Sequence, residues 1–181
     1  MGRLLAPCVV VQLHADAGTV GTTAIDKQPV DSAVKVGKLG LYADVQADRK
    51  HHGGEDQAVY AYAAEDADWW AEQLGRDIPP GLFGENLRVE GVDVSNARVG
   101  ERWRIGDTVV LEVTSPRTPC MTFARWMGEE NNGWVRRFSD ARRLGAYLRV
   151  VSTGSVQAGD PIEVIPAPEG SPTILDTYAG V

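Results

Sequence analysis

One of the two cysteines in the chain stands where its thiol could do chemistry. Cys120 ends the run SPRTPC, after a predicted strand and before a predicted helix. The two prolines hold the cysteine in place, while Arg117 and the start of the helix favour the thiolate, the form that attacks carbon or ligates a metal. An isolated cysteine is more often a small apolar core residue. We interpret Cys8, inside a predicted strand, in that way. For Cys120 the residues alone leave both interpretations open.

A second candidate is a basic turn made of Lys50, His51, His52, Gly53 and Gly54. The glycines let the backbone approach a ligand closely and leave N–H groups free to point at an anion. The lysine adds positive charge, and the histidines can donate a proton near neutral pH. The turn therefore predicts a site for a phosphate or another anion, with a solvated turn as the alternative. A zinc site is less favoured, because adjacent side chains of an extended segment point to opposite faces.

Two further stretches carry polar residues at the edges of predicted strands. Glu85 and Asn86 follow PPGLFG and could hydrogen-bond a heterocycle, although such residues more often tie down a loop. The run RRLGAYLR ends at Arg149, which could line an anion-binding wall or could be ordinary surface charge.

Charge is unevenly distributed along the chain. The formal net charge is −7, yet the segment from Arg117 to Arg149 holds seven arginines against three acidic residues. Such a local basic region suggests a small anionic ligand. The acidic balance of the whole chain argues against a nucleic-acid partner, which requires a cationic face.

Short strands must position these residues. Alternating apolar residues between 98 and 115 predict a hairpin that ends directly before the cysteine loop. Apolar residues at helical spacing predict a helix over 65–74, and helical stretches follow at about 120–128 and 133–143. Further strands are expected at 4–14, 57–62, 85–90, 146–151 and 162–165. Because the helices are inserted rather than alternating with strands, we predict a mainly β fold with α additions (α+β), a barrel or a strongly bent sheet.

The length of 181 residues fits one domain. We place it at residues 1–165, followed by a tail, 166–181, that is either loosely ordered or packed on the domain. No run of about 18 apolar residues predicts a transmembrane helix. Gln12 and His14 interrupt the apolar stretch near the N-terminus, which is better explained as a strand than as a signal peptide. We therefore expect a cytoplasmic protein without a membrane partner.

The basic turn, the Glu85–Asn86 stretch, the cysteine loop and the run that ends at Arg149, taken in this order, resemble the MOSC domain family. The family is named for the C-terminal domain of molybdenum-cofactor sulfurases. The resemblance covers roughly residues 27 to 165 and is closest to small stand-alone bacterial members linked to resistance against 6-hydroxylaminopurine. It is carried by GKLGLYADVQADRKHHGGEDQAVYAY, PPGLFGENL, VGERWRIGDTVVLEVTSPRTPC and LGAYLRVVSTGSVQAGDPI. The motifs HGG, GENL and PRxPC, correctly ordered and widely separated, make the resemblance specific.

The resemblance implies a MOSC-type β-barrel with inserted and C-terminal helices. It also implies binding of molybdenum cofactor, a pterin dithiolene with a phosphate, whose metal would be ligated by Cys120. The cofactor-binding positions that follow are Lys50, His51, His52, Gly53, Gly54, Asn86, Arg117, Thr118 and Arg149. We expect His52 or Glu85 to supply protons as catalytic residues beside Cys120.

The activity that the resemblance implies is reduction of N-hydroxylated compounds, such as hydroxylaminopurines and amidoximes. Electrons would come from a separate reductase, because the chain has no flavin, haem or iron–sulfur signature. One alternative is a carrier or storage protein for molybdenum cofactor, or for sulfur through a Cys120 persulfide. A less favoured one is a pyridoxal phosphate protein, since no lysine stands out as a Schiff-base former. The sequence leaves a monomer and a homodimer equally open.

Overall fold

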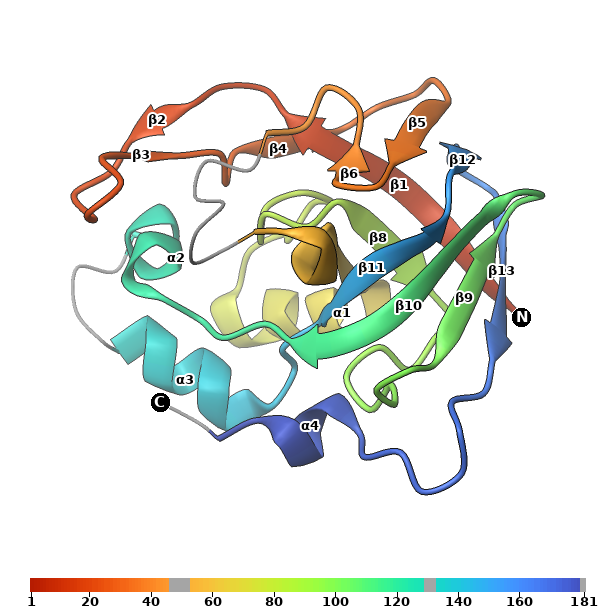
Figure 1. The fold of residues 1–181 in the computed structure, drawn as a ribbon. Coiled ribbons are helices and arrows are strands. Elements are labelled where there is room, and N and C mark those ends of the chain that lie inside the picture. Colours follow the sequence, from red (N-terminus) through yellow and green to blue (C-terminus); the bar gives the residue numbers. More distant parts are fainter. Residues whose placement is uncertain (46–52, 129–132, 180–181) are drawn as a thin grey trace.

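The fold is a β-barrel with helices packed on its outside (Figure 1), which confirms the predicted fold class. The computed structural model describes residues 1–45, 53–128 and 133–179. Around the barrel the strands follow the order β1 (Gly2–Val10), β8 (Leu87–Glu90), β7 (Val59–Ala63), β11 (Ala146–Ser152), β10 (Val109–Pro116), β9 (Arg102–Ile105) and β13 (Pro161–Ile165). Pairing of β13 with β1 closes the ring. Strands β7 and β8 run parallel, and the other pairs in the ring are antiparallel.

The remaining strands lie at the rim of the barrel. Strand β4 (Lys27–Pro29) pairs with the end of β1. A small sheet joins β5 (Val34–Gly37), β6 (Gly40–Leu41) and β12 (Gly154–Val156), and β2 (His14–Ala15) forms a hairpin with β3 (Thr22–Thr23). The predicted strand over 4–14 is thus shorter than expected at its end.

Side-chain alternation explains why the barrel strands form. In β9, Trp103 and Ile105 are fully buried, while Arg102 and Arg104, which alternate with them, are exposed. In β7 and β11, one set of side chains, including Ala61 and Leu148, faces the barrel core. The opposite set, which includes Tyr60, Tyr62 and Tyr147, belongs to a second core outside the barrel wall. Because both faces are covered, β7 is buried along its whole length.

Four α-helices and one 3-10 turn, η1 (Glu55–Gln57), complete the described structure. The helices are α1 (Ala64–Leu74), α2 (Met121–Trp126), α3 (Gly133–Ala141) and α4 (Ile174–Thr177). Helix α1 ends as predicted at Gly75, whose φ of 62° only glycine adopts readily and whose N–H donates to the carbonyl of Ala71. No helix in the described part of the chain is long and apolar enough to cross a membrane.

An aromatic cluster anchors α1, α2 and α3 to the barrel. Phe83, Phe123 and Phe138 are fully buried, with ring centroids 5.0 to 5.7 Å apart, and Trp70 stacks on Phe138 at 5.5 Å. Burial of each such ring contributes roughly 2 to 3 kcal/mol. Since Phe123 lies in the first turn of α2, this packing fixes the position of Cys120, directly before that helix.

The C-terminal tail packs on the barrel, one of the two arrangements that the sequence left open. Ile174 is fully buried, and its N–H donates to the carbonyl of Ala97. Thr173 and Asp176 cap the start of α4 through reciprocal side-chain-to-backbone hydrogen bonds.

Candidate functional site

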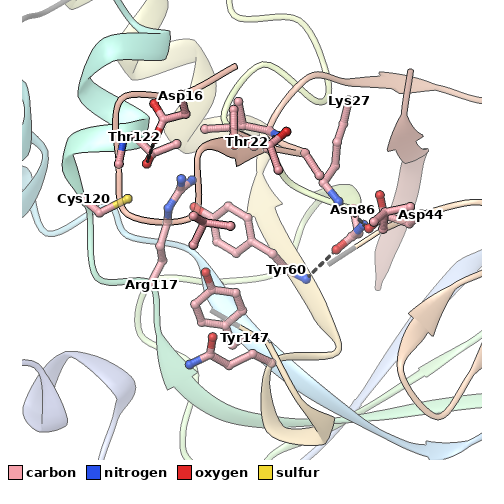
Figure 2. Close-up of a pocket in the computed structure, with 18 of the residues that line it drawn as sticks. Asp16, Thr22, Lys27, Asp44, Tyr60, Asn86, Arg117, Cys120, Thr122 and Tyr147 are labelled. Atoms are coloured by element: carbon pink, nitrogen blue, oxygen red, sulfur yellow. Dashed lines mark hydrogen bonds and ion pairs between the residues drawn. The ribbon is translucent and has the colours of Figure 1, made fainter. Parts of the chain in front are cut away.

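A cavity of about 240 Å³ lies between the outer face of β7 and β11, the β2–β3 hairpin and the start of α2 (Figure 2). Every one of these elements contributes side chains to it. The functional groups in its wall are those of Asp16, Thr19, Thr22, Thr23, Lys27, Asp44, Gln57, Tyr60, Asn86, Arg117, Thr118, Cys120, Thr122 and Tyr147. The cavity thus brings together the predicted residues Cys120, Arg117, Asn86 and Thr118.

The two cysteines lie in different environments. Cys120 directly precedes α2 with an extended backbone (φ −136°, ψ 171°), and its half-buried side chain lines the cavity. Cys8 is fully buried in β1, and this burial raises the pKa of its thiol to about 12. The prediction that Cys8 is a core residue is therefore confirmed, and Cys120 is the cysteine that a ligand in the cavity can reach.

Arg117 brings a buried positive charge to the cavity. Its guanidinium lies 3.9 Å from the ring centroid of Phe123 and 4.9 Å from that of Tyr60, and it donates to the carbonyl of Phe83. Its side chain is 7% exposed, and within the described residues no carboxylate forms an ion pair with it. A buried charge is costly unless an opposite charge or strong hydrogen bonds compensate for it. Arg117 therefore presents a buried positive charge that an anionic group in the cavity could compensate.

A second polar cluster lines the opposite side of the cavity, around Asp44 (Figure 2). Lys27 forms a buried ion pair with Asp44. Asn86 donates to the same carboxylate at 2.7 Å and accepts the N–H of Tyr60 at 3.1 Å. Burial lowers the pKa of Lys27, and the charge of Asp44 opposes that shift. Sequence reasoning missed both Lys27 and Asp44.

Two tyrosines stand side by side in the cavity wall. Tyr60 and Tyr147 pair across β7 and β11, with ring centroids 5.3 Å apart. The hydroxyl of Tyr60 donates to the carbonyl of Leu144 at 2.8 Å, whereas that of Tyr147 forms no hydrogen bond within the described part of the chain. Burial raises the pKa of Tyr147, and the charge of Arg117 opposes this. Tyr147 therefore offers the cavity a protonated phenol, which the sequence analysis did not identify.

The structure contradicts the proton-donor role predicted for Glu85. This side chain is fully buried and does not line the cavity. Its carboxylate accepts the N–H groups of Gly81 at 2.8 Å and Phe83 at 3.1 Å, and it forms an ion pair with Arg88. Glu85 thus ties down the loop before β8, because the two N–H groups and Arg88 hold its carboxylate in place.

Arg149 also lies away from the cavity, so the cavity gives no support to its predicted role in cofactor binding. Its side chain is 45% exposed on β11 and pairs with Glu112 at 2.5 Å and with Asp56 at 3.1 Å. Arg149 shares the outer face of β11 with Tyr147 but lies two residues further along the strand, where the carboxylates of Glu112 and Asp56 engage it. Gly53 and Gly54 lead into η1 but do not line the cavity.

Lys50, His51 and His52 lie outside the described residues. Their predicted roles in anion binding and proton transfer stay predictions.

The chain matches the family model described as the MOSC domain over residues 48–163. It is 36% identical over 143 residues to the uncharacterized protein YflK of Bacillus subtilis, covering 79% of this chain and 63% of that protein. It is 32% identical over 147 residues to protein YiiM of Escherichia coli, covering 79% and 64%. A protein of Gibberella moniliformis named "Reductase" is 32% identical over 187 residues, covering 94% of this chain and 31% of that protein. The chain thus spans less than two thirds of the length of these relatives.

Solved structures show the same architecture. The crystal structure of YiiM from Geobacillus stearothermophilus superposes with a TM-score of 0.76 at 26% identity, covering 97% of this chain and 80% of that one. For YiiM from Escherichia coli the TM-score is 0.69 at 23% identity, with 96% and 74% covered.

Proposed function

Because the chain belongs to the MOSC domain family, we propose that it binds molybdenum cofactor in the Cys120 cavity and reduces N-hydroxylated compounds. Electrons would come from a separate reductase. The observation that carries the proposal is the placement of one accessible cysteine and one buried cation, Arg117, in the wall of the same cavity, where no carboxylate of the described residues pairs with Arg117.

The donor set of the cavity fits this cofactor. No group of three or more His, Cys, Asp or Glu side chains within the described residues could hold a metal ion. A single soft thiolate suits a metal that arrives with sulfur ligands of its own, as in a dithiolene. Cys120 would supply that thiolate.

The other cavity residues fit the rest of the cofactor. Arg117 would offset the negative charge that a phosphate and the metal centre bring. Asp44, Asn86 and Lys27 present a carboxylate, an amide and an ammonium group, which match the donors and acceptors of a pterin ring. Thr118, exposed beside Arg117, adds a hydroxyl.

Reduction of an N-hydroxyl group consumes two electrons and two protons, and the oxygen leaves as water. The molybdenum cofactor, when bound, supplies the redox chemistry. The chain must deliver a proton to the oxygen of the breaking N–O bond. The Tyr147 hydroxyl is suited to hold that proton, because it lines the cavity and hydrogen-bonds no other described residue.

Metal content tests the binding part of the proposal. Chain produced in a host that makes molybdenum cofactor should carry about one molybdenum per molecule, since one thiolate offers one ligation site. Cys120→Ala should lose most of it, and Cys8→Ala, which removes the buried thiol, is the matched control. Mass spectrometry that finds Cys120→Ala fully loaded would exclude the ligand role.

Turnover tests the reductase part. The loaded protein, given a chemical or enzymatic electron donor, should reduce a hydroxylaminopurine or an amidoxime. The name of the fungal relative, "Reductase", is consistent with a reductase role for this chain. Full loading without turnover, tried with several donors, would favour the carrier or storage alternative.

The cavity gives less support to pyridoxal phosphate. Lys27, the lysine in its wall, is engaged in the ion pair with Asp44. A Schiff base would require that lysine to lose its charge and leave a buried carboxylate without its partner.

A further inference from the structure

The β2–β3 hairpin forms a wall of the Cys120 cavity beside α2 (Figures 1 and 2). Its two strands share the residue pairs His14–Thr23 and Ala15–Thr22. Such a short ladder contributes little stability on its own. The hairpin must therefore be held in place by contacts outside itself.

Asp16 holds the hairpin to α2. Its carboxylate accepts two hydrogen bonds from Arg125, from Nε at 2.8 Å and from Nη2 at 2.7 Å, and a third from the hydroxyl of Thr122 at 2.8 Å. The hydrogen bond from Arg125 is the main reason why the pKa of Asp16 falls to about 2. Bidentate pairing of this kind fixes orientation as well as distance. The clamp therefore sets where the hairpin stands relative to Cys120, which directly precedes α2.

Two further features fit the clamp. The ring of His14 packs against Trp126 at the end of α2, with centroids 5.5 Å apart, and its Nε2 pairs with Asp26 at 2.7 Å. The turn passes close over the clamp at Gly18, where an added Cβ would lie 2.7 Å from Oδ2 of Asp16. A larger residue at this position would require either the turn or the Asp16 carboxylate to shift.

The tip of the hairpin faces the cavity. Thr19 and Val20 line the same space as Cys120, and Val20 is 43% exposed. We propose that this hairpin selects compounds by size on their way to Cys120, with Thr19 and Val20 as the limiting side chains and the Asp16–Arg125 clamp holding them in position. The inference goes beyond the proposed function, because it concerns access to the thiol, whatever ligand the cavity holds.

Maleimides of different size test access without cofactor or turnover. The chain would carry Cys8→Ala, so that Cys120 is its one thiol, and would be made in a host that lacks molybdenum cofactor. N-ethylmaleimide and a pyrenyl maleimide share one uncharged reactive group. A change in the reactivity of the Cys120 thiol would therefore alter both modification rates equally and leave their ratio, pyrenyl to ethyl, unchanged. We expect Arg125→Gln to raise the relative rate of the pyrenyl reagent about tenfold, because loss of a charged hydrogen-bond pair populates an open hairpin.

Arg102→Gln is the matched control, since it removes an exposed ion pair, with Glu112, on β9 and away from the cavity. Its rate ratio should equal that of the parent chain. Circular dichroism and thermal unfolding establish that each variant is folded. An unchanged ratio in a folded Arg125→Gln chain would overturn the clamp.

Two substitutions at Val20 test the wall with the clamp intact. Val20→Ala should raise the relative rate of the pyrenyl reagent, and Val20→Trp should lower it. If neither substitution changes the ratio, the hairpin does not limit access. In loaded protein, the kcat/KM ratio of large to small N-hydroxylated compounds should change in the same directions. Absence of any turnover would count against the proposed function, while the maleimide result would still decide the role of the hairpin.

Discussion

Burial of the charged Arg117 side chain costs the folded chain free energy. Its charge is buried between two aromatic rings and faces no carboxylate within the described residues. Replacement of a buried ionic group by an apolar one is often neutral or stabilising in proteins. A buried charge of this kind is better explained by a bound anion than by its contribution to folding.

We expect Arg117→Met to separate folding from binding. In the cofactor-free chain its free energy of unfolding should stay within about 2 kcal/mol of wild type, because removal of a buried charge offsets the lost hydrogen bond to Phe83. Molybdenum content should fall several-fold. Urea unfolding and metal analysis measure the two effects, and Arg117→Lys, which keeps the charge, should recover part of the metal. Loss of stability with full metal retention would contradict an anion-binding role.

Tyr147→Phe tests the proton donor. Without the phenol, turnover of an N-hydroxylated compound should fall by about 100-fold, the range typical of a lost general acid. Molybdenum content should not change. Tyr60→Phe is the control, because its hydroxyl is engaged with the carbonyl of Leu144 and its loss should mainly cost about 1 kcal/mol of stability. Equal loss of turnover in both variants would remove the special role of Tyr147.

Sequence predicted the part of the site that local motifs encode. Cys120 and Arg117 stand out because a rigid loop joins them, and both line the cavity. Lys27 and Asp44 have no local signal, since their ion pair exists only once the segments on either side of β5 and β6 fold back together. Glu85 was misjudged because the sequence cannot show whether a carboxylate faces a cavity or the backbone of its own loop.

At the scale of elements, the Asp16 clamp predicts a specific response to acid. The folded pKa of Asp16, about 2, lies below its ordinary value of 3.8, so ionised Asp16 stabilises the fold above that ordinary value. The contribution is lost as the pH falls from about 4 to about 2. Wild type should therefore lose more unfolding free energy across this window than Asp16→Asn, by roughly 1 kcal/mol. Urea unfolding at several pH values measures this, and parallel curves for the two chains would contradict the clamp.

Element type was more predictable than element boundaries. The fold contains β9 and β10, predicted from alternating apolar residues, and α1, predicted from apolar residues at helical spacing. Both patterns are reliable because they indicate which face of the element is buried. Strand β8 begins two residues later than predicted, at Leu87, since Glu85 bonds to the backbone of its own loop and Asn86 to that of β7. Helix α2 begins after Cys120, whose extended backbone places its thiol in the cavity wall.

At the scale of the molecule, the order of the strands in the ring brings the cavity residues together. Lys27, Tyr60, Cys120 and Tyr147 come from four separate segments and meet because β7, β11 and the end of β10 are neighbours in the ring. Alternation predicted that strands exist, but not that β7 and β8 run parallel or that β13 closes on β1. Those pairings depend on contacts between distant segments, which periodicity in a single strand does not encode.

The packing of the C-terminal tail indicates that the folded domain extends beyond residue 165. Ile174 belongs to the same apolar cluster as the barrel interior, so residues beyond 165 are part of the core. Ile174→Ala should lower the free energy of unfolding by about 2 to 4 kcal/mol, through lost burial and the cavity left behind. Val164→Ala, at a 40% exposed position on β13, is the control and should cost less than about 1 kcal/mol. Urea unfolding compares the two; equal costs would mean that the tail covers the barrel without stabilising it, and that the domain ends before α4.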